Sequence, residues 1–418
     1  MSAAEGSGAR LTDAQRLDWL RLIRTESIGP QTFRALINRH GGAAAALDAL
    51  PRLAARKGRS IAVADVDACR REMDELSARG ARLVALGDPE YPKALRSIHS
   101  PPPLIAVQGD LAVFARPMVA VIGSRNASAA GLAFTERVVR DLAAAGFVIA
   151  SGLARGVDAR AHQASIGMGT VAALAGGLDK IYPPEHVGLA QNICARGALI
   201  SEMPLGWEPR GRDFPRRNRI VAGMALGTLV IEASRGSGSL ITAKFAADEG
   251  REIFAVPGSP LDPRAEGTNQ LLRDGATLCT RAEDVLNVLL PMAGGGEPQL
   301  PLFREDERRA PAEPLWDEFN LLYDEVAAPT TVAGLAFDEP VRAAPSPAFA
   351  DAPRAAHQGL ALRAQVESLL GPSPVALDDL VRASGAPVAQ VRSALLDLEL
   401  EGRLERHGGG LVSLLPQR

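Results

Sequence analysis

Residues 210–242 read RGRDFPRRNRIVAGMALGTLVIEASRGSGSLIT and contain one complete unit of the predicted fold. The stretch begins with an arginine-rich segment, continues into an apolar strand at 228–233, and ends in a Gly- and Ser-rich turn that leads into a helix. Arginine side chains bind phosphate through paired N–H donors, and a helix N-terminus offers free backbone N–H groups. An α/β unit with both features predicts a protein that holds a chain of phosphates.

Similar apolar runs recur along the chain, and each is followed by a segment of helical character. Because such runs separated by helices are typical of a parallel sheet buried on both faces, we predict a doubly wound, Rossmann-like α/β domain over 79–291. In this fold ligands bind at the carboxyl ends of the strands. The runs are 119–123, 147–151, 170–175, 198–201, 228–233, 252–258 and 276–279, and two further short strands are expected at 82–86 and 103–107.

Residues 1–78 are predicted to form a helical domain. Two amphipathic segments flank the break Ser27-Ile28-Gly29-Pro30. Helix, tight turn and helix are typical of a helix-hairpin-helix or sterile-alpha-motif-like module, and a generic small helical domain fits the pattern equally well.

Residues 359–418 are predicted to form a winged-helix domain, with helices at 362–370, 377–383 and 388–401 and a β-hairpin wing at 404–415. This segment has six basic and seven acidic residues. Because affinity for duplex DNA rests largely on neutralised phosphates, the acidic balance favours a protein-contact or accessory role.

A disordered linker is predicted at 292–358, which is rich in Pro, Ala, Gly and acidic residues. The composition of the whole 418-residue chain, 46% hydrophobic and 23% charged, is that of a globular protein. No apolar run reaches the ~18 residues that span a membrane, and the N-terminus has no apolar segment of a signal peptide. The spacing of Cys69, Cys194 and Cys279 fits neither a zinc site nor a disulfide framework, so we expect a cytoplasmic protein without a metal.

The net charge of −3 means that any affinity for nucleic acid must come from a local patch. The candidate patch lies at the strand ends. Ser124 and Arg125 follow one strand, and Lys180, one of only four lysines among 46 basic residues, follows another. Phe214 is either a base-stacking ring or a core anchor for its helix, and Asn218 is predicted to bind a base edge or a neighbouring loop.

Common nucleotide-binding and catalytic patterns are absent from the sequence. Residues 234–244 do not satisfy the Walker A motif, and Ser128 stands where a dinucleotide fingerprint requires its third glycine. No serine has a recognisable His/Asp partnership. We expect Asp158 to cap the following helix and His162 to be a structural or surface residue, and we predict neither catalysis nor a cofactor.

Several motifs then occur in one order along the chain. They are SGLARGVDARAH (151–162), AGGLDKIYPPEH (175–186), SEMPLG (201–206), DFPRRNRIVAG (213–223), EASRGSGSLITAKFAADEGREIFAVPGSP (232–260) and EGTNQLLRDGA (266–276). Together they resemble the bacterial DNA-processing protein A family (DprA, also called Smf) over roughly residues 80–290. The two flanking domains fit the longer members of that family.

The resemblance implies a single-stranded DNA-binding recombination mediator that forms a homodimer, protects incoming DNA and helps load the RecA recombinase during natural transformation. It implies a basic pocket made by the Gly-Ser-Arg loop and the FPxRN segment, which here contain Ser124, Arg125, Phe214, Arg217 and Asn218. Physical argument adds further DNA-binding candidates from the neighbouring strand ends: Lys180, Arg210, Arg212, Ser237, Gly238, Ser239, Thr242 and Lys244. Arg216 and Arg219 are expected to be helix surface or structural ion pairs.

Two alternatives stay open. The first is a nucleotide-processing enzyme of the Rossmann-like phosphoribohydrolase type, whose PGGxGTxxE motif is replaced here by ASRGSGSLITA at 233–243. The second is a winged-helix transcription regulator with a sensory α/β domain, against which the acidic balance of residues 360–418 counts.

Overall fold

The computed structural model describes residues 10–56, 60–293, 354–401, 403–407 and 411–415. The predicted linker at 292–358 therefore falls almost wholly outside the described residues. Its two ends are described: helix α12 continues to Ala293, and helix α13 begins at Arg354, five residues before the predicted start of the winged-helix domain. Ala355, Ala356 and Gln358 are good helix formers, which accounts for the earlier start.

The N-terminal domain is helical, as the sequence predicts. Thr12 and Gln15 form a capping box at the start of the first helix, and the second helix starts at Pro30 and ends at Gly41 in a left-handed conformation with φ 76°. Trp19 and Phe33 pack edge to face with ring centroids 5.0 Å apart. The helices are α1 (Asp13–Arg24), α2 (Pro30–His40), α3 (Ala43–Arg56) and α4 (Val66–Ala78).

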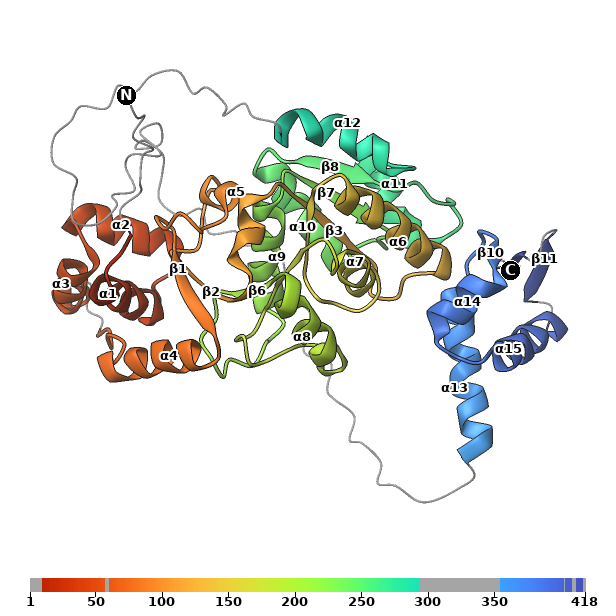
Figure 1. Ribbon diagram of the computed structural model, residues 1–418, viewed down its shortest axis with the longest axis horizontal. Coiled ribbons are helices and arrows are strands. Elements are labelled where there is room, and N and C mark those ends of the chain that lie inside the picture. Colours follow the sequence, from red (N-terminus) through yellow and green to blue (C-terminus); the bar gives the residue numbers. More distant parts are fainter. Residues whose placement is uncertain (1–9, 57–59, 294–353, 402, 408–410, 416–418) are drawn as a thin grey trace.

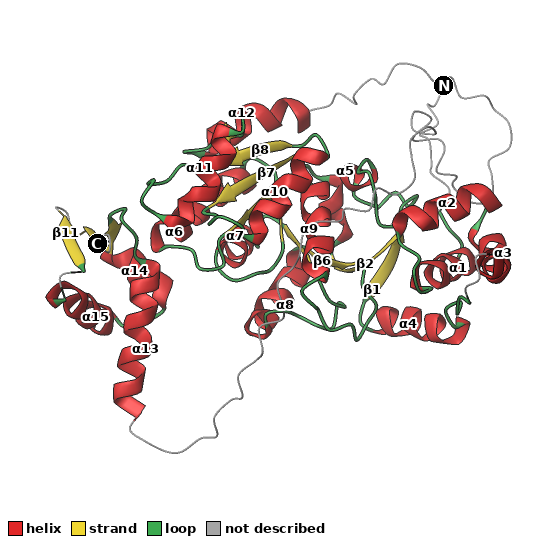
Figure 2. Cartoon of the chain, turned by 180° about the vertical axis from the view of Figure 1, so that it is seen from behind, coloured by secondary structure: helices red, strands yellow, loops and turns green. Residues whose placement is uncertain are grey.

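A nine-stranded sheet forms the middle of the molecule, between the N-terminal helices and the winged-helix domain (Figure 1). Its strand order is β1-β2-β6-β5-β4-β3-β7-β8-β9, and helices cover both faces (Figure 2). The strands are β1 (Ala81–Ala85), β2 (Leu104–Gly109), β3 (Met118–Gly123), β4 (Val148–Ser151), β5 (Thr170–Ala173), β6 (Ala198–Ser201), β7 (Gly227–Ile231), β8 (Glu252–Ala255) and β9 (Thr277–Leu278).

Alternate residues of each central strand enter different cores, because side chains of a strand point to opposite faces. In β3, Ala120 and Ile122 pack in the core under α5, α9 and α10, whereas Val119 and Val121 pack under α6, α7 and α12. The helices of this domain are α5 (Lys93–Arg96), α6 (Ala129–Ala144), α7 (Val157–Ser165), α8 (Val187–Arg196), α9 (Asp213–Met224), α10 (Gly238–Asp248), α11 (Glu266–Arg273) and α12 (Ala282–Ala293), with short 3₁₀ helices η1 (Leu111–Ala115), η2 (Pro184–His186) and η3 (Pro263–Ala265).

One part of the sheet departs from the predicted all-parallel arrangement. Strands β3 to β9 pair in parallel, but β1 pairs with β2, and β2 with β6, in antiparallel register. The short strands expected at 82–86 and 103–107 are confirmed as β1 and β2, and they extend the main sheet. Their pairing places the N-terminal helices beside the sheet edge, where Arg16 donates to the carbonyl of Leu83 at 2.7 Å.

The C-terminal segment has the predicted winged-helix pattern, with one additional short strand. Strands β10 and β11 flank β12, and β11 and β12 form the wing. The elements are α13 (Arg354–Leu369), β10 (Val375–Ala376), α14 (Leu377–Ser384), α15 (Val388–Leu400), β11 (Leu404–His407) and β12 (Leu411–Leu414).

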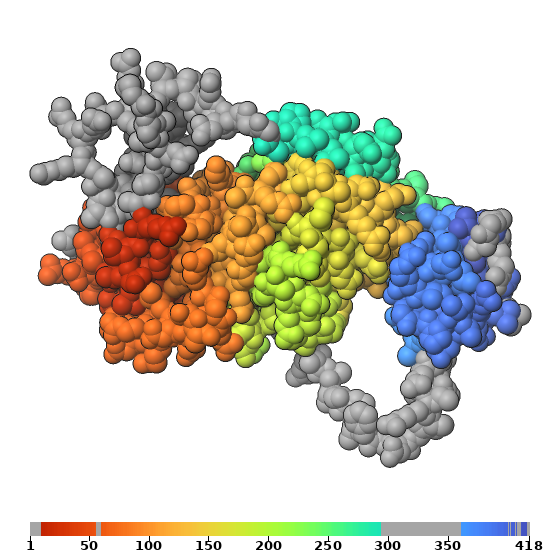
Figure 3. Space-filling model, in the orientation of Figure 1, coloured from red at the N-terminus to blue at the C-terminus, as the bar shows by residue number. Residues whose placement is uncertain are grey.

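The winged-helix domain packs against the central domain beside α6 (Figure 3). Arg264 donates from its guanidinium group to the carbonyls of Ser368 and Leu370 at 2.9 and 2.6 Å, and its Nε lies 3.1 Å from Asp262. Ala129 of α6 belongs to the buried core of the winged-helix domain. The contact therefore combines a charged clamp with an apolar surface.

Candidate nucleic-acid interface

The predicted binding residues lie where the parallel strands of the sheet end, along what we call its carboxyl edge. Strand β3 is the switch point, because β4 lies on one side of it and β7 on the other, and doubly wound sheets bind ligands at that position. The candidates follow the carboxyl ends of four parallel strands: Ser124 and Arg125 after β3, Lys180 after β5, Arg210 to Asn218 after β6, and Ser237 to Lys244 after β7.

Phe214, half-buried in the first turn of α9, is the centre of an aromatic and basic cluster. The Tyr182 ring approaches it edge-on, with centroids 5.6 Å apart and an interplanar angle of 70°. The guanidinium carbons of Arg125 and Arg217 lie 5.4 and 5.9 Å from the Phe214 ring centroid. We call Tyr182, Phe214 and Arg125 the aromatic step; it joins the loops after β3 and β5 to α9.

Arg217 differs from Arg125 because it is buried, with 5% of its surface exposed. Its Nη1 donates to the carbonyl of Ala173 at 3.2 Å. The guanidinium group lies against Gly152, where an added Cβ would come within 1.6 Å of Nη1. Burial lowers the pKa of Arg217, and the charge of Asp158 opposes this. The contacts of Arg217 are thus internal, and phosphate binding by this residue stays a prediction.

Asp158 shapes the loop after β4. Its carboxylate accepts hydrogen bonds from the N–H groups of Gly152 and Ala154 at 3.2 and 3.3 Å. Asp158 therefore stabilises the loop before α7. The N-cap of α7 is Gly156, so the predicted role of Asp158 as a helix cap is wrong. Burial raises the pKa of Asp158, and the nearby Arg217 charge opposes that rise.

His162 is a buried structural residue, in agreement with the prediction. Its Nδ1 lies 2.7 Å from the hydroxyl of Thr170, and that hydroxyl donates to the carbonyl of Ile149 at 2.8 Å. Nδ1 must therefore carry the proton and act as the donor. Burial, together with the smaller effects of the positive charges of Arg217 and His186, lowers the pKa of His162 to about 3. The ring is neutral at physiological pH.

Asn218 connects α9 to the start of α10. Its Nδ2 donates to the carbonyl of Gly238 at 3.3 Å, so it binds a neighbouring loop, one of its two predicted roles. The hydroxyls of Ser237 and Ser239 are 2.8 Å apart, and Thr242, which is buried, donates to the same Gly238 carbonyl at 3.5 Å. The serines stand at the N-terminus of α10, beside backbone N–H groups that suit an anion.

The other candidates have partners of their own. Nζ of Lys180 lies 2.6 Å from Glu208, which holds the pKa of Lys180 above its usual value. The guanidinium carbon of Arg210 lies 5.1 Å from the ring centroid of Trp207. The Ser124 hydroxyl accepts the N–H of Asn126 at 3.1 Å. The negative charge of Glu208 beside Lys180 therefore disfavours a phosphate at this position.

Within the described ranges, five exposed basic side chains of this edge form no ion pair with an acidic side chain. They are Arg125, Arg210, Arg212, Arg235 and Lys244. Arg216 and Arg219, by contrast, both pair with the buried Glu202 at the end of β6, so they are structural pairs, one of the two roles expected for them. Arg235 and Tyr182 were not among the predicted site residues. Each lies in a loop that follows a parallel strand, and that position is the sequence feature that could have identified them.

The N-terminus of α6 is occupied by a side chain of the protein itself. The carboxylate of Glu232 accepts the N–H of Ser128 at 2.8 Å and also the Ser128 hydroxyl. Glu232 adopts a left-handed conformation with φ 52°, and a Cβ at Gly131 would come within 2.6 Å of its carboxyl carbon. Burial raises the pKa of Glu232. A nucleotide phosphate would have to displace this carboxylate.

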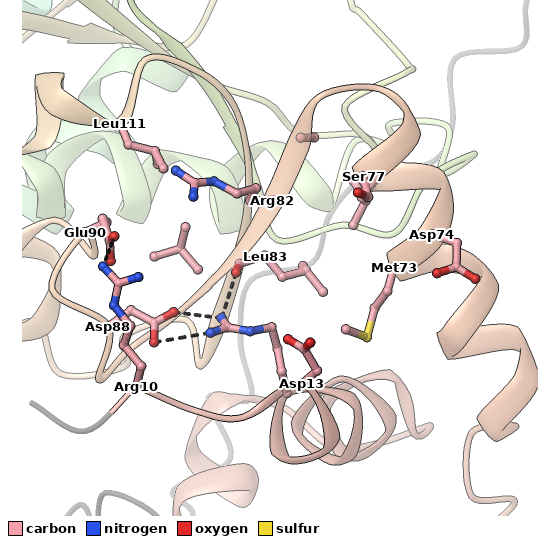
Figure 4. Close-up of a pocket in the computed structure, with 14 residues that line it drawn as sticks. Arg10, Asp13, Met73, Asp74, Ser77, Arg82, Leu83, Asp88, Glu90 and Leu111 are labelled. Carbon is pink, nitrogen blue, oxygen red and sulfur yellow. Dashed lines mark hydrogen bonds and ion pairs between the residues drawn. The ribbon is translucent and has the colours of Figure 1, made fainter.

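Two pockets of the described residues lie away from the aromatic step. One, of about 390 Å³, lies between α1, α4 and β1, where Arg10 pairs with Glu90 and Arg16 with Asp88 (Figure 4). Another of about 390 Å³ lies between α6 and the winged-helix domain. Across the described part of the chain, no three His, Cys, Asp or Glu side chains are grouped to hold a metal ion. No described helix is both long and apolar enough to cross a membrane.

Three family models match successive parts of the chain. The model of DNA recombination-mediator protein A matches residues 82–290, that of the DprA-like N-terminal HHH domain residues 13–74, and that of the DprA winged helix domain residues 350–410. The second match favours the helix-hairpin-helix alternative for the N-terminal domain.

Curated relatives and a solved structure agree with these matches. Protein Smf of Synechocystis sp. is 31% identical over 348 residues, 81% of each chain. DNA processing protein DprA of Streptococcus pneumoniae is 42% identical over 198 residues, which are 47% of this chain and 70% of that protein. The X-ray structure of DprA from Streptococcus pneumoniae superimposes with a TM-score of 0.56 at 29% identity, covering 67% of this chain and 99% of that one.

Proposed function

We propose, from the premise that this chain belongs to the DNA recombination-mediator protein A family, that the loops at the carboxyl edge of its sheet bind single-stranded DNA. The family gives the chain a DNA-processing role in recombination. The aromatic step carries the proposal, because it sets the exposed Tyr182 ring and the half-buried Phe214 ring beside Arg125, which has no ion pair among the described residues, at the switch point. Single-stranded DNA offers phosphates to the basic groups and unpaired bases to the rings.

The same geometry disfavours two other nucleic-acid ligands. In a duplex the bases are stacked on one another, so the rings of Tyr182 and Phe214 would have no face to bind. A mononucleotide would need the N-terminus of α6, which the carboxylate of Glu232 occupies. A single DNA strand fits the spread of candidates across the sheet from β6 to β7 better than either.

A competition experiment tests the proposal. Fluorescence anisotropy would compare a labelled single-stranded oligonucleotide with the duplex of the same sequence at several salt concentrations. We expect tighter binding of the single strand. The logarithm of its binding constant should fall linearly with the logarithm of the salt concentration. Equal or tighter binding of the duplex would contradict the proposal, as would release of free base from nucleoside monophosphates, which marks the phosphoribohydrolase alternative.

The finer role follows from the family alone. We propose that the protein acts as a non-catalytic cytoplasmic homodimer that protects incoming DNA and helps load RecA during natural transformation. Sedimentation velocity would test the dimer. RecA ATPase activity on single-stranded DNA would test loading: we expect a shorter lag when the protein is added, and an unchanged or longer lag would contradict a mediator role.

A further inference from the structure

Tyr182 is an exposed aromatic ring at the edge of the proposed DNA site. It is 49% exposed, whereas Tyr91, the other tyrosine in the described residues, is 1% exposed and donates its hydroxyl to the carbonyl of Pro102. An exposed tyrosine ring presents a flat apolar face to solvent, which suits contact with a ligand ring. The position of Tyr182 next to Phe214 places this face within the proposed DNA site.

The two rings of the aromatic step are not equivalent. Phe214 is half-buried and already has Arg125, Arg217 and Tyr182 around its ring. Tyr182 is the outer member, and Phe214 supports it from the protein side. A base that approaches from solvent therefore meets the Tyr182 ring first.

The loop that carries Tyr182 is held in place before any ligand arrives. The N–H of Gly177 donates to the carbonyl of Trp207 at 3.0 Å, and the carboxylate of Asp179 accepts the N–H of Gly206 at 2.8 Å. On the other side of Tyr182, the imidazole Nδ1 of His186 donates to the carbonyl of Leu153 at 2.8 Å. A preordered ring loses less conformational entropy on binding, which favours its use as a binding surface.

Phosphate-binding groups flank this ring. Arg125, whose guanidinium carbon lies 5.4 Å from the centroid of the Phe214 ring, is exposed and has no ion pair within the described ranges. Near Tyr182, Arg155 pairs with Glu185 and Lys180 pairs with Glu208. A strand that places one base on Tyr182 thus has basic groups within reach for the adjacent phosphates.

We propose that Tyr182 is a base-stacking residue of this protein, which takes one unpaired base of single-stranded DNA on its exposed face and is supported by Phe214. The inference rests on the proposed function, because it names a contact within that binding site. It assigns base recognition to Tyr182, with Phe214 behind it, and phosphate recognition to Arg125 and its basic neighbours.

Two variants and two ligands test this inference. Tyr182→Ala removes the ring and Tyr182→Phe retains it. Each is titrated into a labelled oligo(dT) strand and into a strand of equal length with abasic sites. We expect Tyr182→Ala to bind oligo(dT) about 5- to 100-fold more weakly, which corresponds to the ~1–3 kcal/mol of one stacked base, and Tyr182→Phe to bind within about twofold of the wild type. On the abasic strand all three proteins should bind alike.

Met168→Ala is the matched control. Met168 is 47% exposed and lies before the amino end of β5, the strand whose carboxyl end leads to Tyr182, so its removal should leave both affinities unchanged. Thermal melts confirm that the variants are folded. If Tyr182→Ala binds oligo(dT) as the wild type does while Arg125→Ala binds it more weakly, the stacking role is wrong and the DNA site stands. If the wild type does not bind oligo(dT) at all, the proposed function is wrong too.

Discussion

At the scale of single residues, burial separates two arginines that contact the same ring. Arg125 is exposed, whereas Arg217 is 5% exposed and donates to the carbonyl of Ala173. An exposed guanidinium group binds phosphate without loss of internal contacts. A buried one stabilises the fold, and its removal leaves a cavity.

The first prediction compares these two arginines. Arg217→Ala should lower the free energy of unfolding by about 2–5 kcal/mol, because it empties a buried site. Arg125→Ala should leave the melting temperature unchanged, weaken binding of single-stranded DNA, and reduce the slope of log affinity against log[salt] by about 1. Calorimetry and salt-dependent anisotropy measure the two effects.

Arg140→Ala controls for the loss of a positive charge. Arg140 lies near the end of α6, with 65% of its side chain exposed and an ion pair to Glu136. It should bind DNA as the wild type does. Equal losses of affinity in Arg125→Ala and Arg140→Ala would show that net charge, and not the aromatic step, determines binding.

The second prediction concerns His162 and pH. Its folded pKa, about 3, lies below its unfolded value of 6.5, so the unfolded chain takes up the proton first as pH falls. The stability contribution is therefore complete above pH 6.5 and is lost as pH falls towards 3. Between pH 6 and pH 4 the wild type should lose about 1.4 kcal/mol per pH unit more than His162→Asn, whose amide can replace Nδ1 as donor to Thr170.

Urea unfolding at several pH values measures this difference. Replacement of the exposed His99 by Asn controls for the loss of an imidazole elsewhere in the chain. A His162→Asn variant with the wild-type slope would contradict the lowered pKa of His162 in the folded protein.

At the scale of elements, local sequence patterns predicted the strands and the position of the site. The apolar runs from 119 to 279 all became strands of the one sheet, because each run contains its own signal. The strand-end loops were predicted from glycine, serine and arginine next to those runs. The antiparallel pairing of β1 and β2 was not predicted, because strand direction depends on how the chain returns to the sheet.

Side-chain partners within the site could not be predicted from local patterns. The burial of Arg217 depends on Gly152, which leaves room for its guanidinium group and comes from the loop after β4. The pairing of Lys180 with Glu208 joins the loops after β5 and β6. Such contacts depend on which strands become neighbours, and strand order was not encoded in any single motif.

The third prediction tests how the loop after β4 fits α9. Gly152→Ala should destabilise the protein by about 1–3 kcal/mol, because the new Cβ would overlap the Arg217 guanidinium group. It should also weaken DNA binding, since displaced Arg217 no longer supports Phe214. Gly188→Ala is the control: it lies in α8 with no atom within 4 Å of the added Cβ, so it should stabilise the helix slightly. Equal melting temperatures for the two variants would contradict this packing.

At the scale of the whole molecule, the winged-helix domain is held against the central domain by one charged clamp and a small apolar contact. Arg264 binds two carbonyls at the end of α13, where the partial negative charge of the helix favours a cation. The clamp lies next to η3, after β8, beyond the proposed DNA loops. Docking and DNA binding should therefore be separable.

The fourth prediction follows from that separation. Arg264→Ala should release the winged-helix domain, raise the radius of gyration in small-angle X-ray scattering, and leave the affinity for oligo(dT) unchanged. Arg273→Ala, at an exposed position of α11, should keep the wild-type radius. An unchanged radius for Arg264→Ala would show that the apolar contact with α6 alone holds the domain.

The central claim is where single-stranded DNA binds on this protein. Hydrogen–deuterium exchange with and without saturating oligo(dT) tests it most directly. Binding at the carboxyl edge of the sheet predicts slower exchange in the loops after β3, β5, β6 and β7, including residues 124–126, 180–182, 213–218 and 237–240. It predicts unchanged exchange in α1 to α4 and in α15. Protection confined to the N-terminal helices or to the winged-helix domain, with these loops unchanged, would contradict the account.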